Sequence, residues 1–410
     1  MSNKSGALSP QAVAIVVSGC VIVLVSFGMR SSYGVFLPDM SESMGWGREV
    51  LALSLAIQNL MWGVAQPFAG ALAERYGAGK VLVASALLYC AGLYLSAQGY
   101  SELVTHMSAG FFVGIATAGT GFGVILSMVG RAVPAGKRSF WLGVVTAAGS
   151  GGQLFVVPIA AEMLNYFDWS STLTIFAFLV LIIIPAAWFL RGSVEESGDD
   201  VQSSTFGRTM KEASRHSGFL LLTSGFFVCG FHVAFIGVHF PAYVKDLGFS
   251  VQLGAIALSV VGGANIIGSL LSGYLGGIYS KKYLLSFLYL SRAATFTIFL
   301  VTPPSVTSIM IFSVVIGLLW LSTVPLTSGL VAQIFGPRYM GTLFGVVFFS
   351  HQVGSFLGVW LGGRFRDLYG SYDIIWWSGV VLGVVAAILH WPIKEEAFDW
   401  SKSNGKAEQG

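Results

Sequence analysis

Two arginines lie inside long apolar runs of this sequence, where a charged side chain is costly. Arg30 is eight residues before Pro38, a rise of about 12 Å along a helix. Arg292 lies in the middle of a later run. A charge at the centre of a membrane costs on the order of 2.5–3.5 kcal/mol, so it normally faces a partner or a water-filled cavity. Each arginine therefore either bonds to the protein itself or binds an anion.

Arg30 has no obvious acidic partner, because no Asp or Glu lies at a similar depth in any apolar run. A carboxylate from outside the protein would match the parallel donors of its guanidinium. The alternative is that Arg30 bonds backbone carbonyls at a helix break and serves packing alone. We favour the anion-binding interpretation.

Three histidines, His232, His239 and His351, also lie in apolar runs. Histidine titrates near neutrality, so any of them could carry a proton, although a single helical histidine is more often a core residue with satisfied hydrogen bonds. Uncharged residues that could contact a solute are Tyr33, Asn59, Gln66, Gln153, Asn265, Gln352, Trp320 and Phe231. This set suits a small, mostly apolar monoanion better than a sugar, which needs more amide and carboxylate partners.

The composition places these residues in a membrane. Hydrophobic residues make up 55% of the 410-residue chain and charged residues only 10%, whereas a soluble domain carries about 25% charged residues. The 52 glycines are consistent with helices that pack closely in lipid. We therefore expect an all-α membrane protein surrounded by the lipid bilayer, with no nucleic-acid partner because the basic residues form no stripe.

Twelve apolar windows are long enough to cross a bilayer, which takes about 20 residues. They lie near residues 12–37, 49–73, 79–98, 102–130, 139–163, 169–190, 217–243, 250–277, 283–301, 305–334, 341–363 and 373–392. A polar stretch after the sixth window indicates a linker. We predict a six-helix bundle over 1–190, a cytoplasmic linker over 191–215, a second six-helix bundle over 216–393 and a cytoplasmic tail over 394–410.

The loop charges predict the orientation. With both termini in the cytoplasm, the cytoplasmic segments hold sixteen Lys and Arg residues and the outer loops hold four. This asymmetry favours an N-in, C-in topology. The first apolar run lacks a small-residue cleavage site, so we expect it to be retained as a span.

The two halves resemble each other. Gly28-Met29-Arg30 before Leu37-Pro38 is repeated as Gly230-Phe231-His232 before Phe240-Pro241, and Gly70 corresponds to Gly273, at offsets of 202 or 203 residues. Internal repeats of this kind are common in transporters. The repeat makes Arg30 and His232 pseudo-symmetric partners and predicts a central cavity.

A loop between the second and third windows carries Gly70, Glu74, Arg75, Gly77 and Lys80. It resembles the signature loop of the major facilitator superfamily, with Glu74 in place of the usual Asp. The resemblance implies two six-helix bundles and alternating access. The five residues would act in gating, with Glu74 held at the positive end of a helix that starts near Gly341. The alternative is that Glu74 and Arg75 are only a solvated pair.

Finer patterns resemble the bacterial relatives of monocarboxylate transporters and oxalate/formate exchangers. They are Tyr33-Gly34-Val35-Phe36 before Gly45-Trp46-Gly47-Arg48, His239-Phe240-Pro241-Ala242-Tyr243, and Gly362-Gly363-Arg364-Phe365-Arg366-Asp367. This resemblance implies a small organic anion as substrate. It also implies that the first and seventh spans line the cavity and that Arg292, in the peripheral ninth span, is structural.

Two departures from this branch argue against a dianion site. The eighth window carries no charge, and the eleventh offers His351-Gln352 where the exchangers have Lys. The fifth window also lacks the adjacent Gly-Pro pair of drug/proton antiporters. A monoanion therefore fits better than an oxalate-type dianion or an exported drug.

These observations predict a secondary active transporter of a small organic anion, a monocarboxylate, with proton symport as the coupling scheme. The substrate-binding candidates are Arg30, Tyr33, Asn59, Gln153, His232, His239, Asn265, Trp320, His351 and Gln352. The alternatives are an exporter of amphiphilic or drug-like compounds and a non-transporting membrane receptor. We expect a monomer in a bacterial inner membrane, with no enzyme activity, cofactor or metal, because no catalytic or ligand motif is evident.

Overall fold

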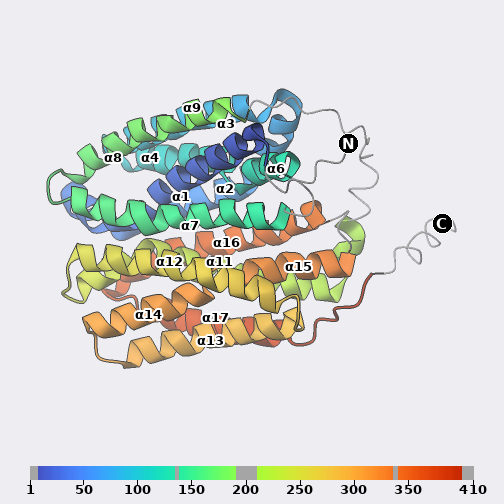
Figure 1. The fold of residues 1–410 in the computed structure, drawn as a ribbon. Coiled ribbons are helices and arrows are strands. Elements are labelled where there is room, and N and C mark those ends of the chain that lie inside the picture. Colours follow the sequence, from blue (N-terminus) through green and yellow to red (C-terminus); the bar gives the residue numbers. More distant parts are fainter. Residues whose placement is uncertain (1–7, 134–137, 191–209, 336–339, 399–410) are drawn as a thin grey trace. The chain divides into compact units, whose positions relative to one another are not determined.

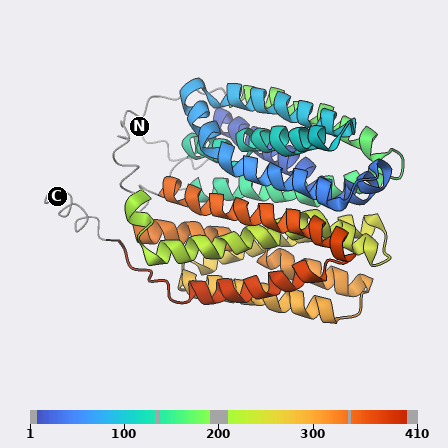
Figure 2. The same cartoon turned by 180° about the vertical axis from the view of Figure 1, so that it is seen from behind.

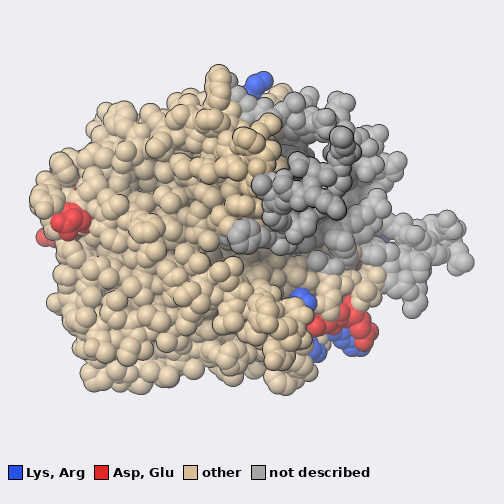
Figure 3. All heavy atoms as spheres, in the orientation of Figure 1, with Lys and Arg blue, Asp and Glu red and all other residues tan. Residues whose placement is uncertain are grey.

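The computed structural model describes residues 8–133, 138–190, 210–335 and 340–398, and every regular element in these ranges is a helix (Figure 1). The predicted all-α fold class is therefore confirmed. On the face drawn in Figure 3, charged side chains gather near helix ends, and the surface between them is uncharged. This distribution is expected of helices whose middle portions lie in hydrocarbon.

The helices follow the predicted windows closely. In the first half they are α1 (Pro10–Met44), α2 (Arg48–Tyr76), α3 (Ala78–Ala97), α4 (Glu102–Thr105), the π-helical η1 (His106–Phe112), α5 (Val113–Thr120), α6 (Phe122–Ala132), α7 (Arg138–Met163), α8 (Trp169–Leu179), the 3₁₀ segment η3 (Val180–Ile182) and α9 (Ile183–Trp188). In the second half they are α11 (Ser217–Asp246), α12 (Val251–Leu275), α13 (Lys281–Val301), α14 (Val306–Leu319), α15 (Thr323–Phe335), α16 (Met340–Tyr369) and α17 (Asp373–His390).

Eleven helical segments within the described ranges are long and apolar enough to cross a membrane. The remaining predicted span corresponds to α2, a 29-residue helix that is more polar because it carries Gln58, Asn59 and Gln66 among its apolar residues. The count of twelve spans stays a prediction.

The chain forms two compact units. Unit 1 contains residues 1–196, 235–263 and 359–370, and unit 2 contains residues 197–234, 264–358 and 371–410. Three helices, α11, α12 and α16, contribute one end to each unit. The predicted division into bundles over 1–190 and 216–393 stays a prediction.

Small residues allow close helix contacts inside unit 1. Helix α1 packs along α7, and a Cβ added at Gly28 would come within 2.9 Å of the carbonyl oxygen of Gly152. Gly110 approaches α2 in the same way, with the Ser54 carbonyl oxygen 2.8 Å from the added Cβ. The expected role of these glycines in helix packing is confirmed. In unit 2 the main pair is α13 and α17, which lie side by side in Figures 1 and 2.

Side chains cap several helix starts. Asp168 precedes α8 and accepts the Ser171 N–H at 2.6 Å. Hydrogen bonds from Ser171 hold the pKa of the Asp168 carboxyl below its usual value. Ser305 and Ser308 form a capping box at the start of α14. These caps satisfy donors that the first helical turn leaves unpaired.

Two of the predicted spans are interrupted helices. The fourth contains the π-helical turn η1 and then a break at Gly121, whose backbone is extended (ψ −173°). The tenth is interrupted between α14 and α15, over residues 320–322. The breaks fall in corresponding spans of the two sequence halves, a pattern that often marks the binding region of a transporter.

Candidate functional site

Arg30 lies on α1 in unit 1 and is partly exposed. Its Nη2 donates a hydrogen bond to Asn59 Oδ1 on α2, and its guanidinium carbon lies 5.0 Å from the centre of the Trp62 ring. Its Nε is buried without a hydrogen-bond partner. Among the described residues, the charge of Arg30 thus meets a neutral amide and an aromatic face, but no carboxylate.

Asn59 is held in a fixed orientation. Its side chain is 1% exposed, and its Nδ2 donates to the Leu55 carbonyl at 2.8 Å, one turn earlier on α2. Because the amide nitrogen is occupied in this way, the amide oxygen faces Arg30. Asn59 therefore orients the guanidinium without neutralising it.

A line of side chains on α2 connects this site to the interrupted fourth span. Its members recur every four residues, so they share one helix face. Of these members, Gln66 was expected from the sequence, but Ser54, Gln58 and Trp62 were missed. The four-residue spacing within an apolar run was the signal that could have found them. The bonds are Ser54 Oγ to His106 Nδ1 (2.8 Å), Gln58 Nε2 to Ala109 O (2.8 Å), Trp62 Nε1 to Gln66 Oε1 (2.9 Å) and Gln66 Nε2 to Ala118 O (3.4 Å).

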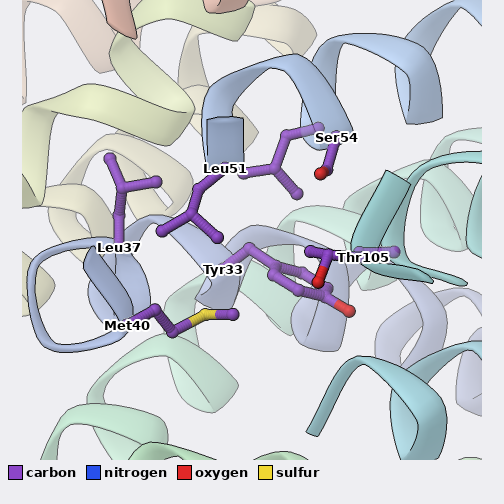
Figure 4. Close-up of a pocket in the computed structure, with 8 residues that line it drawn as sticks. Tyr33, Leu37, Met40, Leu51, Ser54 and Thr105 are labelled. Carbon is purple, nitrogen blue, oxygen red and sulfur yellow. The ribbon is translucent and has the colours of Figure 1, made fainter. Parts of the chain in front are cut away.

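Tyr33 lies one turn after Arg30 and is 3% exposed. It lines a small pocket with residues from α1, α2 and the start of the fourth span, including Met40, Ser54 and Thr105 (Figure 4). The pocket has a volume of about 10 Å³, room for about one water molecule. It is too small for an organic substrate, so Tyr33 contacts a solute only if the helices around it move.

Gln153 connects two helices of unit 1. Its Nε2 donates to the Leu258 carbonyl of α12 at 2.8 Å. Beside it, Val35, Val157, Ala161, Ala255 and Leu258 form an apolar cluster. Gln153 thus has an internal partner.

The three predicted histidines are all buried. His232 Nε2 is 2.8 Å from the Gly379 carbonyl oxygen, and His239 Nε2 is 2.7 Å from the Val359 carbonyl oxygen. His351 differs, because its Nδ1 contacts a side-chain oxygen, Gln352 Oε1, at 3.0 Å. The first two contacts are those of core histidines, and the role of any histidine in proton transfer stays a prediction.

Arg292 in unit 2 has a structural role, as expected. It is 1% exposed, its Nε and Nη2 donate to the Leu319 carbonyl at 3.1 and 2.6 Å, and Nη2 also donates to the Trp320 carbonyl. These carbonyls end α14, where the helix dipole is negative. Arg292 therefore caps the break in the tenth span.

Asn265 on α12 bonds the backbone at the same break. Its Oδ1 accepts the Leu321 N–H at 2.9 Å and the Ser269 hydroxyl at 3.0 Å. Trp320, the residue at the break, is 5% exposed, and Gln352 is 0% exposed. In this conformation the predicted binding residues of unit 2 are largely occupied by internal contacts.

The predicted gating loop is only partly described. Gly77 has φ +91°, a conformation that glycine adopts without strain, and it forms the turn between α2 and α3. Gly70 is partly buried and Lys80 is exposed. The side chains of Glu74 and Arg75, and those at residues 340–342, lie outside the described residues, so the predicted contact with the helix near Gly341 stays a prediction.

One end of unit 1 carries a network of charges that the sequence analysis treated only as topological signals. It joins the ends of α1, α2, α11 and α16. The opposite-charge doublets in the sequence, such as Arg48-Glu49 and Lys245-Asp246, could have indicated it. The ion pairs are Arg48 to Asp246 (2.5 Å), Arg366 to Asp246 (2.9 Å), Arg364 to Glu49 (2.7 Å) and Lys245 to Asp39 (2.9 Å).

Asp367 of α16 caps the start of α2 in this network. The N-cap residue of α2 is Gly47, which has no side chain to accept a hydrogen bond. Asp367 Oδ1 accepts the Arg48 N–H at 3.0 Å, and Oδ2 accepts the Glu49 N–H at 2.6 Å. A carboxylate at a helix N-terminus is favoured by both the free N–H groups and the helix dipole.

Comparison with known proteins identifies the family. The model of the Major Facilitator Superfamily matches residues 19–359. The chain belongs to this superfamily. It is similar to the uncharacterized MFS-type transporter YcxA of Bacillus subtilis, with 26% identity over 84% of this chain and 86% of that protein. It is also similar to monocarboxylate transporter 13 of Bos taurus, with 22% identity over 84% and 80% of the two chains.

A solved structure has the same fold. The nucleoside transporter NupG superposes with a TM-score of 0.78 at 13% identity, over 92% of this chain and 99% of that one. The protein is therefore a multi-pass membrane transporter of the major facilitator superfamily. The substrate and the coupling ion are a separate question, which depends on the residues described above.

Proposed function

We propose that the protein is a secondary carrier of a small organic monoanion, a monocarboxylate, that works by alternating access between two six-helix halves. The observation that carries this proposal is Arg30, a half-buried arginine in a membrane-spanning helix whose described partners, Asn59 and Trp62, are both neutral. A charge in this position is unfavourable unless an anion or water reaches it.

The contacts of Arg30 suit a carboxylate. Asn59 and Trp62 fix the position of the guanidinium from two sides, so little of its side-chain entropy remains to be lost on binding. A carboxylate can accept two parallel N–H donors from one guanidinium, and such charge-assisted bonds are roughly twice as strong as neutral ones. A neutral solute would leave the charge uncompensated.

The relatives support the class of substrate. Monocarboxylate transporters are among the proteins that this chain resembles over most of its length. The low identity means that this support concerns only the class. Within the proposal the protein has twelve spans with both termini in the cytoplasm, and the charge network at the ends of α1, α2, α11 and α16 faces the outside of a bacterial inner membrane.

A co-transported proton would make the uptake of a monocarboxylate electrically neutral. We therefore keep proton symport as the coupling scheme, with His351 as the first histidine to test because its imidazole contacts a side chain rather than a backbone carbonyl. Export of amphiphilic compounds and a receptor role without transport are the competing functions.

Uptake by the purified protein in proteoliposomes tests the proposal. The panel contains a short monocarboxylate, its neutral amide, a dicarboxylate, a sugar and a cationic amphiphile, each with and without a pH gradient. We expect uptake of the monocarboxylate but not of its amide, and accumulation when the outside is acidic. Equal uptake of acid and amide, or uptake of the amphiphile alone, would contradict it.

A further inference from the structure

Three aromatic rings form a group that reaches the Arg30 guanidinium through Trp62. Phe27 is one turn before Arg30 on α1, and its ring centre lies 5.5 Å from that of Trp62, edge to face at 79°. Phe27 also contacts Phe122, the first residue of α6, at 4.6 Å and 32°. The rings and the guanidinium thus form one continuous group, with Trp62 in contact with both Arg30 and Phe27.

The rings differ in exposure. Trp62 is 7% exposed, so it forms the buried side of the group, whereas Phe27, Phe122 and Arg30 are each partly exposed. A cationic residue and two aromatic residues, each half-buried, therefore occur together. Because Arg30 cannot favourably face lipid at this depth, we take its exposed side, with the neighbouring rings, to face the central cavity predicted from the sequence.

The backbone holds the rings in position. The break at Gly121 starts α6 directly at Phe122, and Gln66, which accepts the Trp62 indole N–H, bonds the Ala118 carbonyl just before that break. From α7, Gly149 lets the ring of Phe122 lie against the backbone, since an added Cβ would be 3.0 Å from Phe122 Cζ. A larger side chain at this position would displace the ring.

We infer that the favoured substrate is an aromatic carboxylate, with its carboxylate on Arg30 and its ring against Phe27 and Phe122. Phe27 and Arg30 are i, i+3 neighbours on one helix face, about 5–6 Å apart at Cβ, so an acid whose ring is attached directly to its carboxylate reaches both. Rings pack edge-to-face or offset against other rings, which adds to simple burial. This inference rests on the proposed carboxylate site and adds the shape of the substrate.

Two acids of equal charge and similar size test the inference. Benzoate and cyclohexanecarboxylate differ in having an aromatic or a saturated ring, and butyrate has no ring. The measurement is the concentration of each acid that halves binding or uptake by the purified protein in proteoliposomes. We expect benzoate to bind about 3- to 10-fold more tightly than cyclohexanecarboxylate, the advantage typical of an aromatic pair.

Substitutions of Phe27 and Phe122 test whether these rings cause the preference for benzoate. Phe27→Leu and Phe122→Leu should each bring the ratio of benzoate to cyclohexanecarboxylate affinity toward one. The matched control is Phe155→Leu on α7, because Phe155 is 59% exposed and lies outside the group, so its ratio should equal that of the wild type. Two independent Phe variants guard against loss of folding in one of them, which size-exclusion chromatography would reveal.

The outcomes separate the inference from the proposed function. Equal affinity for the two ring acids in the wild type, or a ratio unchanged in both folded Phe variants, would overturn the inference. Arg30→Gln tests the function itself and should abolish binding of butyrate and benzoate alike. If Arg30→Gln binds benzoate normally, or if the wild type binds none of the three acids, the proposed function fails and the inference with it.

Discussion

Arg30 and Arg292 are both arginines within membrane-spanning helices, but their surroundings differ. Arg292 is 1% exposed and donates three hydrogen bonds to the carbonyls that end α14. Arg30 is partly exposed and donates one hydrogen bond to an amide, while its flat face lies on an indole ring. Backbone carbonyls accept from Arg292 Nε and Nη2, although its Nη1 is buried without a partner, whereas Arg30 is the arginine that we propose binds an anion.

The comparison teaches that the partners of an intramembrane charge indicate its role better than its depth does. Carbonyls at a helix end carry partial negative charge and cannot be displaced without disrupting the fold. An amide and an aromatic ring orient a cation but leave its charge available. The two amides differ in a similar way. Asn59 accepts a hydrogen bond from the Arg30 side chain, whereas Asn265 accepts one from the backbone N–H of Leu321.

The largest expected effect is that of Arg30→Gln on carboxylate affinity. Hydrogen bonds to charged groups contribute about 1.5–3 kcal/mol each, so the loss of two should weaken binding at least about 100-fold. Arg30→Lys keeps the charge but loses the fork geometry of the guanidinium. Its carboxylate affinity should therefore lie between those of the wild type and Arg30→Gln. The measurement is substrate-protected thermal stability or uptake, with the amount of folded protein as control.

Normal carboxylate affinity in Arg30→Gln would show that the two arginines do not differ in the way proposed. An uncharged solute would then become the leading substrate candidate. Loss of folded protein in Arg30→Gln would instead show that Arg30, like Arg292, supports the fold.

Arg292→Gln should lower stability and leave substrate affinity nearly unchanged, the opposite of Arg30→Gln. It removes donors from two buried carbonyls, and each unsatisfied buried group costs about 1–3 kcal/mol. We expect a clearly lower melting temperature and less folded protein, while the protein that folds keeps its substrate affinity within about twofold. Arg292→Met, which restores volume but no donor, should match it in stability. A drop in affinity without a drop in stability would assign Arg292 to the substrate.

The helix positions were predicted well from the sequence because they follow from local hydropathy, which depends only on the residues that each window contains. The predicted span 79–98 is observed as Ala78–Ala97, and 283–301 as Lys281–Val301. The structural role of Arg292 was also predicted. The helix breaks were missed, because an apolar run does not show where neighbouring side chains take over backbone hydrogen bonds.

The surroundings of Arg30 were only partly predictable for a related reason. Absence of a nearby acidic residue could be read from the sequence, but the contact with Trp62 requires α1 and α2 to be placed side by side. The cap that Asp367 supplies to α2 joins residues more than 300 positions apart in sequence, a pairing that no local pattern encodes. Partners in tertiary structure, rather than residue types, decide these roles.

His351→Gln tests whether proton coupling involves the one predicted histidine that contacts a side chain. For symport of one proton per substrate, a gradient of one pH unit supports up to about tenfold accumulation. We expect His351→Gln to remove most of this accumulation while leaving exchange across the membrane without a gradient. His232→Gln and His239→Gln are the controls and should keep coupling. Full coupling in all three variants would show that none of the three histidines carries the proton.

The smallest effects are expected from the two amides, and they give the finest test of the contrast between the arginines. Asn59→Leu removes the acceptor that orients Arg30, so carboxylate affinity should fall about 3- to 10-fold, in line with about 1 kcal/mol for one hydrogen bond. Asn265→Leu removes the acceptor for the Leu321 N–H and should lower the melting temperature instead, with affinity unchanged. Both variants make the same Asn→Leu replacement, so the change in side-chain volume is the same at the two sites. The measurements are substrate affinity and melting temperature of each purified variant. If the two variants show the same pair of changes, the amides do not distinguish a ligand-facing arginine from a structural one, and the assignment of Arg30 to the substrate would lose its support from geometry.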